Sequence, residues 1–415
     1  MGPRPRGPTL FRFCTHSGLH AKQAQITEDR RMTCLPPLTD LLRQLIATPS
    51  VSSDHPRHDM GNLPVVSLMA NWLEGLGFSC EVLPLASHPE KANLIATLGS
   101  GPGGLVLAGH TDTVPYDDSG WDADPFTLSE RDQQWYGLGV CDMKGFLALA
   151  VEAASLCRGE RLRAPLILLA TADEESGMEG ARALVEAGKP KARHAVIGEP
   201  TNLRPVRLHK GILMDSLHVH GHAGHSSRPD LGANAIRGMH QVLDALLTHE
   251  AELAQHRCGR GFAIDHPTMN LGCIEGGDSA NRIPAHCRLD VDMRFGPDDD
   301  IATLRTGLRE AAHKGLTEAG CRLEPQTLFE GIPAFETAAT TAIVEACEAL
   351  TGHRAEAVDF ATEGPFLNQL GMDTVILGPG DIAVAHQPNE SLPLDRIAPT
   401  QELLRALIQR FCLTT

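Results

Sequence analysis

The sequence predicts an α/β fold, a mainly parallel sheet flanked by helices, with an inserted α+β domain of the ferredoxin-like kind. Short, nearly continuous apolar runs such as residues 104–109 and 165–171 alternate with helical segments, which is typical of parallel strands buried on both faces. Between about residues 210 and 328, apolar and polar residues alternate one by one, as in strands with one exposed face. At 415 residues the chain has room for both parts.

The first 31 residues are expected to stand apart from this fold. They carry six basic and two acidic residues without helical or strand periodicity. We interpret them as a disordered tail, or as a translation start placed upstream of Met32. An organelle transit peptide remains an alternative, whereas a secretory signal would need an unbroken apolar stretch. The main domain is therefore expected at residues 32–209 and 329–415, and the inserted lid or dimerisation domain at residues 210–328.

Apolar residues spaced three and four apart predict the first helices of the main domain. One begins near Leu38 and ends before Pro49, and a second covers about residues 64–76. A third follows Asp142 in the run FLALAVEAASL. Strands alternate with these helices, as in a parallel sheet. We expect strands at residues 104–109, 165–171, 194–198 and 374–378.

The insert shows the order β, α, β, β, α, β. Its helices are expected near residues 235–246 and 301–318, between alternating strands such as 217–220 and 288–295. That order predicts a ferredoxin-like sheet. Because such a sheet has exposed edges and one open face, pairing with a second copy would cover them, and we expect a homodimer.

Composition and charge argue against several classes of protein. A net charge of −16 disfavours nucleic-acid binding, which needs a concentrated basic face. No apolar run reaches the roughly 18 residues of a membrane helix. The 11 cysteines form no CxxC pair, so neither a disulfide framework nor a thiolate zinc site is indicated. We expect a cytoplasmic protein that acts on a small molecule, without nucleic-acid or membrane partners.

Acidic and histidine residues lie in turns just beyond the apolar runs. Ligands of parallel sheets gather beyond the carboxyl ends of the strands, and carboxylates and imidazoles bind divalent metals. Taken singly, each residue has a simpler interpretation as a loop histidine, a helix-capping aspartate or a solvated acidic loop. Their joint occurrence predicts a two-metal hydrolytic site. The predicted ligands are His110, Asp142, Glu175, Glu199 and His386.

Two adjacent glutamates in the run ATADEES predict two different roles, one as a metal ligand and one as a general base. We expect Glu175 to bind metal and Glu174 to remain free as the general base, because metal hydrolases pair an ion that lowers the pKa of water with a carboxylate that takes its proton. In the run AGHTDT, one nitrogen of His110 can bind metal while Asp112 accepts a hydrogen bond from the other. The prediction is therefore hydrolysis of an amide by metal-activated water.

The wording of these motifs resembles a known family. GHTDTVP, GVCDMKG, ATADEES, IGEPT, GHAGHSS, NRIPA, DMRF, TEGPF, ILGPG and AHQPNE are similar to the motifs of the di-zinc metallopeptidase family that includes acetylornithine deacetylase, succinyl-diaminopimelate desuccinylase and glutamate carboxypeptidase. The resemblance runs from about Met32 to the C-terminus. GHTDTVPYDDSGWDADPFTL, EPTNLRPVRLHKG and TEGPF are most similar to the acetylornithine deacetylase branch.

The resemblance implies two zinc ions per subunit, which cobalt or manganese could replace. One ion would take His110 and Glu199, the other Glu175 and His386, and Asp142 would bridge both. It also implies hydrolysis of N2-acetyl-L-ornithine to L-ornithine and acetate. Another N-acylamino acid, such as N-acetylcitrulline or N-succinyl-diaminopimelate, is the alternative substrate, and a catalytically silent binding protein on the same scaffold is the alternative class.

The resemblance further implies roles for residues outside the metal ligands. Glu174 matches the general base and Asp112 the partner of His110. His225, in GHAGHSS of the insert, matches a histidine that reaches the active site of the partner subunit and stabilises the oxyanion. Its alternative interpretation is a histidine in a small-residue loop.

Contacts with the substrate are the last implication. Asn281 and Arg294 match positions near the substrate carboxylate, although either could be a structural strand residue. Glu363 would meet the side-chain ammonium of acetylornithine. Gly378 and Gly380 are expected to leave backbone groups close to the substrate, because glycine permits tight approach.

Overall fold

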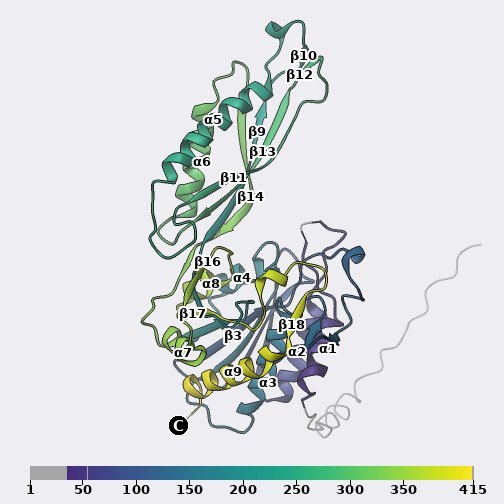
Figure 1. Ribbon diagram of the computed structural model, residues 1–415, viewed down its shortest axis with the longest axis vertical. Coiled ribbons are helices and arrows are strands. Elements are labelled where there is room, and N and C mark those ends of the chain that lie inside the picture. The colour runs from purple at the N-terminus through teal and green to yellow at the C-terminus, as the bar shows by residue number, and fades with distance from the viewer. Residues whose placement is uncertain (1–34, 54, 414–415) are drawn as a thin grey trace, which may run out of the picture.

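A mixed sheet flanked by helices forms the lower part of the computed structural model in Figure 1, and an elongated inserted domain rises from it. The structure describes residues 35–53 and 55–413, so the expected tail at residues 1–31 lies outside the described residues. We call residues 35–209 and 333–413 the main domain and residues 210–332 the inserted domain. Within the described residues, no helix combines the length and apolar character needed to cross a membrane.

The large sheet of the main domain has the strand order β1-β2-β6-β3-β7-β17-β8-β15, with β16 paired to β8. Its strands are β1 (Ser79–Pro84), β2 (Ala92–Leu98), β3 (Leu105–His110), β6 (Leu166–Thr171), β7 (His194–Ile197), β8 (Val206–His209), β15 (Phe335–Glu336), β16 (Glu356–Val358) and β17 (Asp373–Ile376). A small separate sheet has the order β18-β5-β4. Its strands are β4 (Ser129–Arg131), β5 (Gln134–Tyr136) and β18 (Ser391–Pro393).

The centre of the large sheet is parallel, as the sequence predicts. Strands β6, β3, β7 and β17 run in the same direction. At the two sides, β1 is antiparallel to β2, β2 to β6, and β8 to β17. Every residue of β3 and β6 is buried, because helices leave neither face open to water. The carboxyl ends of the four parallel strands therefore meet at one edge of the sheet.

Helices of the main domain pack in two groups. They are α1 (Leu38–Ile46), α2 (Leu63–Gly75), α3 (Lys144–Ala154), α4 (Glu179–Ala187), α7 (Ala342–Thr351), α8 (Gly364–Gln369) and α9 (Ile397–Phe411). Helix α3 lies against β3 and contacts α1 and α9, whereas α4 contacts α8. The chain moves from β3 to β6 and then back past β3 to β7, so right-handed crossovers place α3 and α4 on opposite faces. The helices predicted from Leu38 and at residues 64–76 correspond to α1 and α2.

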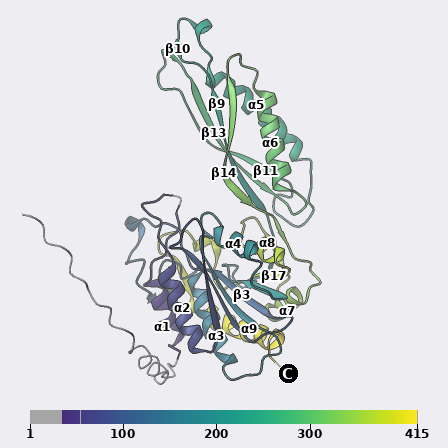
Figure 2. The same cartoon turned by 180° about the vertical axis from the view of Figure 1, so that it is seen from behind.

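The four long strands and two helices of the inserted domain follow the predicted order, and two short strands, β10 (Gly224–His225) and β12 (Arg282–Ile283), are added to it. The other elements of the domain are β9 (Gly211–His220), α5 (Ala235–Leu253), β11 (Thr268–Gly276), β13 (His286–Phe295), α6 (Ile301–Gly315) and β14 (Arg322–Ile332). The main sheet has the order β11-β13-β9-β14, and α5 and α6 pack side by side on it (Figure 2). Strand β14 continues beyond the expected boundary at residue 328, because its last residue, Ile332, still pairs with Ile212 of β9.

Candidate metal centre

The predicted metal ligands converge at the carboxyl edge of the parallel strands. His110 is the last residue of β3, Glu175 follows β6, and Glu199 follows β7. Asp142 lies just before α3, and His386 lies in the loop after β17. All but His386 come from positions that the sheet and α3 fix directly, so the topology gathers residues that are far apart in the sequence.

Asp142 stands between two groups of donor atoms. Its Oδ1 lies 3.0 Å from Nε2 of His110, which lies 4.0 Å from Oε1 of Glu199. Its Oδ2 lies 3.4 Å from Nε2 of His386, which lies 3.1 Å from Oε2 of Glu175. The two oxygens of one carboxylate thus face one histidine and one glutamate on each side.

Unpaired, buried negative charge shows that these residues fit divalent cations. Oε1 of Glu175 and Oε1 of Glu199 are buried without a hydrogen-bond partner, a costly state for carboxylate oxygens. Burial and the charge of Glu199 raise the pKa of Glu174 well above its usual value; burial and the charge of Asp142 do the same to Glu199. Bound cations would remove this cost, and carboxylate and imidazole donors suit zinc, cobalt and manganese alike.

His110 is oriented by a backbone group rather than by the carboxylate that the sequence suggested. Its Nδ1 donates a hydrogen bond to the backbone carbonyl of Asp112 at 2.9 Å, whereas Oδ1 of Asp112 is 3.8 Å away. The chain turns directly after β3, which brings this carbonyl onto the ring. The carboxylate of Asp112 instead accepts the backbone N–H of Glu175 at 3.1 Å and so links the two ligand turns.

The turn that carries Glu174 and Glu175 is held by the aspartate before them. Asp173 has a left-handed φ of 63°, which costs energy for a residue with a side chain. Its carboxylate accepts a hydrogen bond from Lys91 Nζ at 2.7 Å and from the backbone N–H of Gly177 at 3.0 Å. These contacts hold the turn, in which Glu174 lies near His110 and Glu199 while Glu175 contacts His386.

Glu390 is a structural residue that the sequence analysis did not identify. Its buried carboxylate accepts the backbone N–H groups of Gly139, Cys141 and Asp142 at 2.7–2.9 Å. Burial raises the pKa of Glu390 to about 8, against the lowering effect of these donors. Glu390 thereby fixes the loop that presents Asp142. Glu390 is the last residue of the AHQPNE motif that also contains His386. Its place in a ligand-bearing motif was the sequence feature that could have identified it.

Lys144 is a second residue that the sequence analysis missed. It follows Asp142 by two positions in the GVCDMKG motif and is 1% exposed. Its Nζ donates to the backbone carbonyls of Leu45 and Thr48 at 3.2 and 2.9 Å, which ties the start of α3 to the end of α1. Burial lowers the pKa of Lys144 to about 7, although Asp112 and Glu390 counteract this.

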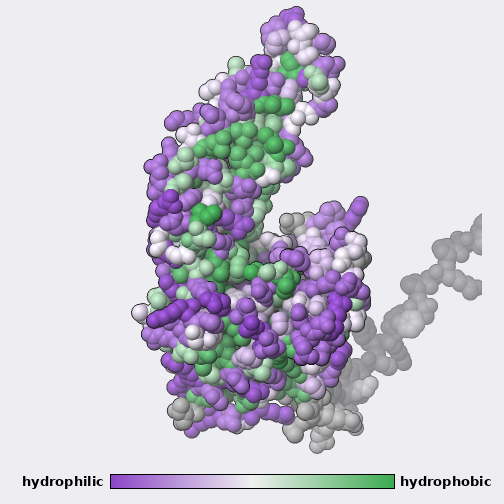
Figure 3. Space-filling view, viewed as in Figure 1, coloured by the Kyte–Doolittle hydropathy of each residue, from purple (hydrophilic) through white to green (hydrophobic). Residues whose placement is uncertain are grey.

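A cleft of about 940 Å³ opens over the metal centre. Figure 3 shows the molecule hollowed between the main and inserted domains. From the main domain the cleft is lined by Glu174 and the ligands Asp142, Glu175, Glu199 and His386. From the inserted domain it is lined by Ile212, Met214, Arg294, Leu328, Phe329 and Ile332. The free carboxylate of Glu174 and an arginine therefore face the same space.

The predicted substrate residues divide into those near the cleft and those away from it. Arg294 lines the cleft, where its guanidinium forms two hydrogen bonds with Asp292 at 2.9 and 3.2 Å. Asn281 and His225 lie instead at the far end of the inserted domain, around β10 and β12 (Figure 1), and neither lines the cleft of its own chain. Nδ1 of His225 accepts the backbone N–H of Ser227 at 3.2 Å.

Glu363 lies beneath the metal centre and not on the surface of the cleft. It is 2% exposed, and its Oε1 has no hydrogen-bond partner. Burial raises its pKa to about 7, and its charge raises the pKa of Glu174 and of Glu199. A cationic group that entered this position would find a buried carboxyl with one unpartnered oxygen.

Gly378 and Gly380 permit close packing of the ligand loops. A Cβ on Gly378 would stand 2.2 Å from the carbonyl oxygen of Gly198, and one on Gly380 would stand 2.2 Å from Sγ of Cys141. Both glycines are buried, and neither lines the cleft. Their lack of a side chain lets the loop leading to His386 lie against the Glu199 and Asp142 loops.

Comparison with known proteins agrees with this geometry. A model of peptidase family M20/M25/M40 matches residues 106–410. The acetylornithine deacetylase of Pasteurella multocida (strain Pm70) is 45% identical over 381 residues, covering 92% of this chain and 100% of that protein.

Solved structures share the fold at much lower identity. The metallo-carboxypeptidase Sso-CP2 of Sulfolobus solfataricus is 18% identical with a TM-score of 0.72, covering 90% of this chain and 99% of that one. The Bacillus subtilis YXEP protein, described as a dinuclear metal-binding peptidase, is 16% identical with a TM-score of 0.63, over 89% and 97% of the two chains. From the family match and the relative of 45% identity, the chain belongs to peptidase family M20/M25/M40.

Proposed function

We propose that this chain hydrolyses N2-acetyl-L-ornithine to L-ornithine and acetate, a reaction that serves arginine biosynthesis. The observation that carries the proposal is the 45% identity to an acetylornithine deacetylase over the whole length of that protein. The cleft, with buried carboxylates and the half-exposed imidazole of His386 at its base, supplies a site for the reaction. The described cysteines are free thiols, which fits a cytoplasmic enzyme.

The family and the donor atoms support a divalent metal cofactor, and we propose two zinc ions. His110 and Glu199 would hold one ion and Glu175 and His386 the other, with Asp142 shared. Cations held there would polarise the acetyl carbonyl and lower the pKa of the attacking water. Cobalt or manganese could take the same positions.

Glu174 is proposed as the base that accepts the proton of the attacking water and passes it to the departing nitrogen. It lines the cleft and lies near His110 and Glu199. The neighbouring glutamate, Glu175, is the one that contacts His386. Burial and neighbouring negative charge raise the pKa of Glu174, which favours its capacity to hold a proton. Asp112 is proposed to position the ligand turns rather than to touch the substrate.

Two residues are proposed to select the substrate. Arg294 would bind the carboxylate of the substrate through its planar guanidinium, exchanging Asp292 for it. Glu363 does not line the cleft, so the side-chain ammonium of the ornithine portion would have to reach past the ligand residues to pair with its unpartnered, buried Oε1. An N-acylamino acid without that ammonium would leave this carboxyl unpaired and should bind more weakly.

The decisive experiment compares kcat/KM for N2-acetyl-L-ornithine, N-acetylcitrulline and N-succinyl-diaminopimelate on zinc-loaded protein. We expect acetylornithine to give the highest value. Glu174→Gln, which keeps the size of the side chain and removes the base, should keep its zinc and lose about 10²- to 10⁴-fold in kcat. A preference for either other substrate would reject the assignment of substrate, and a fully active Glu174→Gln enzyme would reject the assignment of the base.

We further propose a homodimer in which His225 of each subunit reaches into the cleft of the other subunit. Within one chain His225 is exposed at the tip of the inserted domain and does not line the cleft. Strand β11 is an unpaired edge of its sheet, and Ile274 on β11 and Ile236 and Leu247 on α5 are exposed at 54%, 44% and 53%. Because Nδ1 of His225 accepts a hydrogen bond from Ser227, its Nε2–H is available to donate to an oxyanion.

Mixing two inactive variants tests this exchange. In a hybrid of Glu174→Gln and His225→Ala subunits, one of the two cleft sites would contain both native groups. Random reassociation should therefore restore about a quarter of the wild-type activity. If the mixture stays as inactive as its components after verified subunit exchange, His225 does not act across the interface.

A further inference from the structure

Three histidines gather on the open face of the inserted domain, away from the metal centre in the cleft. His218 and His220 are separated by one residue on β9, so their side chains leave the same face of the sheet. His286 on β13 is the direct cross-strand partner of His220. The centroids of the three rings lie 5.1–6.2 Å apart. We call these residues the histidine cluster.

We propose that the histidine cluster binds a divalent transition-metal ion such as Zn²⁺. One nitrogen from each ring lies within 4.8 Å of the others, and Nδ1 of His218 is 3.0 Å from Nε2 of His286. Two imidazole nitrogens on one tetrahedral zinc ion stand about 3.3 Å apart. Three imidazoles with one open position form a known kind of zinc site, so small rotations of these rings would complete it.

A chain of hydrogen bonds orients His218 for this role. The hydroxyl of Ser216 donates to Oδ1 of Asp290 at 2.6 Å, so it accepts a hydrogen bond from Nε2 of His218 at 3.0 Å. The proton of His218 is thereby placed on Nε2, and the lone pair of Nδ1 faces His286. The ring N–H of a metal-binding histidine that does not face the ion usually donates a hydrogen bond to a carboxylate, a backbone carbonyl or a water. Here the hydroxyl of Ser216 connects His218 to the carboxylate of Asp290.

The formal charges of the four ionised side chains beside the histidine cluster balance. Oε2 of Glu324 lies 3.5 Å from Nε2 of His220. The two arginines on this face are already paired, Arg322 with Glu324 and Arg288 with Asp290. The carboxylates thus offset the arginines beside the three imidazoles.

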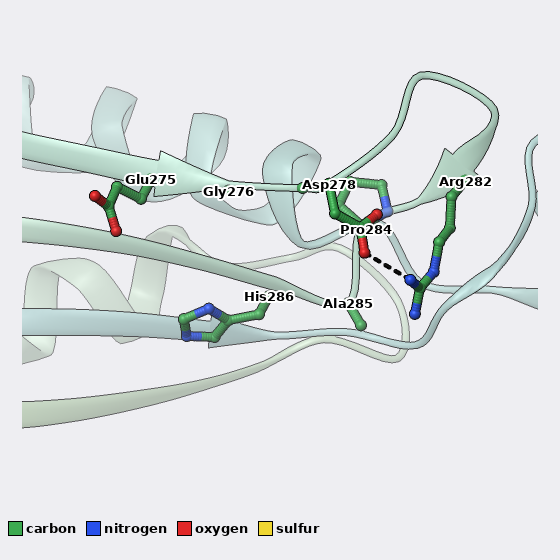
Figure 4. Close-up of a pocket in the computed structure, with 8 residues that line it drawn as sticks. Glu275, Gly276, Asp278, Arg282, Pro284, Ala285 and His286 are labelled. Atoms are coloured by element: carbon green, nitrogen blue, oxygen red, sulfur yellow. Dashed lines mark hydrogen bonds and ion pairs between the residues drawn. The ribbon is translucent and has the colours of Figure 1, made fainter.

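The histidine cluster is also accessible. His286 is exposed and lines a pocket of about 310 Å³ that opens at the end of the sheet. Figure 4 shows His286 and Glu275 on neighbouring strands, while Asp278 and Arg282 pair with each other farther along the pocket. An ion can therefore reach the imidazoles without opening of the fold.

Zinc content of the full-length protein tests the proposal. After dialysis against micromolar Zn²⁺, His218→Ala and His286→Ala should each hold about one zinc ion per chain fewer than the wild type, measured by inductively coupled plasma mass spectrometry. The matched control is His240→Ala, an exposed histidine on α5 outside the cluster, which should keep the wild-type content. Ser216→Ala should weaken zinc binding at this position about tenfold by removing the orienting hydroxyl.

The same measurement separates this ion from those of the cleft. In an Asp142→Asn background, the zinc that remains should disappear on adding His218→Ala. Both single histidine variants should retain hydrolytic activity and the wild-type circular dichroism spectrum, since neither residue lines the cleft. Equal zinc content in the wild type and both folded variants would overturn the proposal, whatever the outcome for the proposed function.

Discussion

The two halves of the metal centre are held in different ways. His110 is 1% exposed, ends a buried strand and has its ring fixed by a backbone carbonyl at 2.9 Å. The side chain of His386 is 52% exposed, and the residue stands in a loop with a left-handed φ of 58°. Its ring contacts Asp142 and Glu175, the two carboxylates with which it would share an ion.

This difference determines how much binding free energy is lost in ordering each ligand side chain. A ligand at the end of a buried strand is in place before an ion arrives, whereas an exposed loop side chain loses conformational freedom on binding. We therefore expect the His110 half to retain its ion more tightly than the His386 half. Asp142, held by Glu390, belongs to both and is the residue on which the comparison depends.

The largest effect is expected from Asp142→Asn. The amide keeps the shape of the side chain but removes the shared negative charge, so both ions should be lost and kcat/KM should fall on the order of a thousandfold. Metal content and turnover on N2-acetyl-L-ornithine measure this directly. Asp395→Asn, an aspartate with a side chain 79% exposed, is the control. With the histidine cluster removed by His218→Ala, retention of one full ion by Asp142→Asn would show that the halves are independent.

Removing one histidine at a time tests the inequality between the halves. His386→Ala should release one zinc ion on dialysis and keep the other, whereas His110→Ala should weaken both the tighter ion and the position of Asp142. We expect a loss of about a hundredfold in activity for the first and more for the second. Zinc per chain against dialysis time distinguishes them. Equal release from the two variants would contradict the difference drawn from burial.

The sequence predicts the His110 half of the centre better than what holds it. Apolar runs ending at His110, Thr171 and Ile197 indicate parallel strands. The carboxyl ends of parallel strands meet at one edge of the sheet irrespective of the loop conformations. The roles of Glu390 and Lys144 could not be read in this way, because their partners are backbone groups that come together only in the folded chain. The packing of Gly378 against Gly198 is likewise a contact between separate loops.

Glu390→Gln tests the support of the shared ligand. The amide can accept fewer than three backbone N–H groups with full strength, and its own NH₂ would face donors, so the loop carrying Asp142 should loosen. We expect both ions to bind about 10- to 100-fold more weakly, with the overall fold kept. Zinc titration against a competing chelator gives both constants. Glu130→Gln, in the nearby small sheet, is a matched glutamate control, and unchanged affinity in Glu390→Gln would remove the supporting role.

The smallest expected effect is that of a change of one pH unit on metal uptake by the metal-free protein. Hydrogen bonds to Asp142 and Glu175 raise the pKa of His386 to about 10, so at neutral pH this imidazole is protonated and must release its proton before it can bind an ion. Affinity of the His386 half should therefore rise with pH, by about tenfold per unit for one displaced proton, until pH approaches 10. Calorimetry in buffers of different ionisation enthalpy counts that proton. Because Ala cannot be protonated, His386→Ala should lose one released proton, and an unchanged count would assign the titration to another residue.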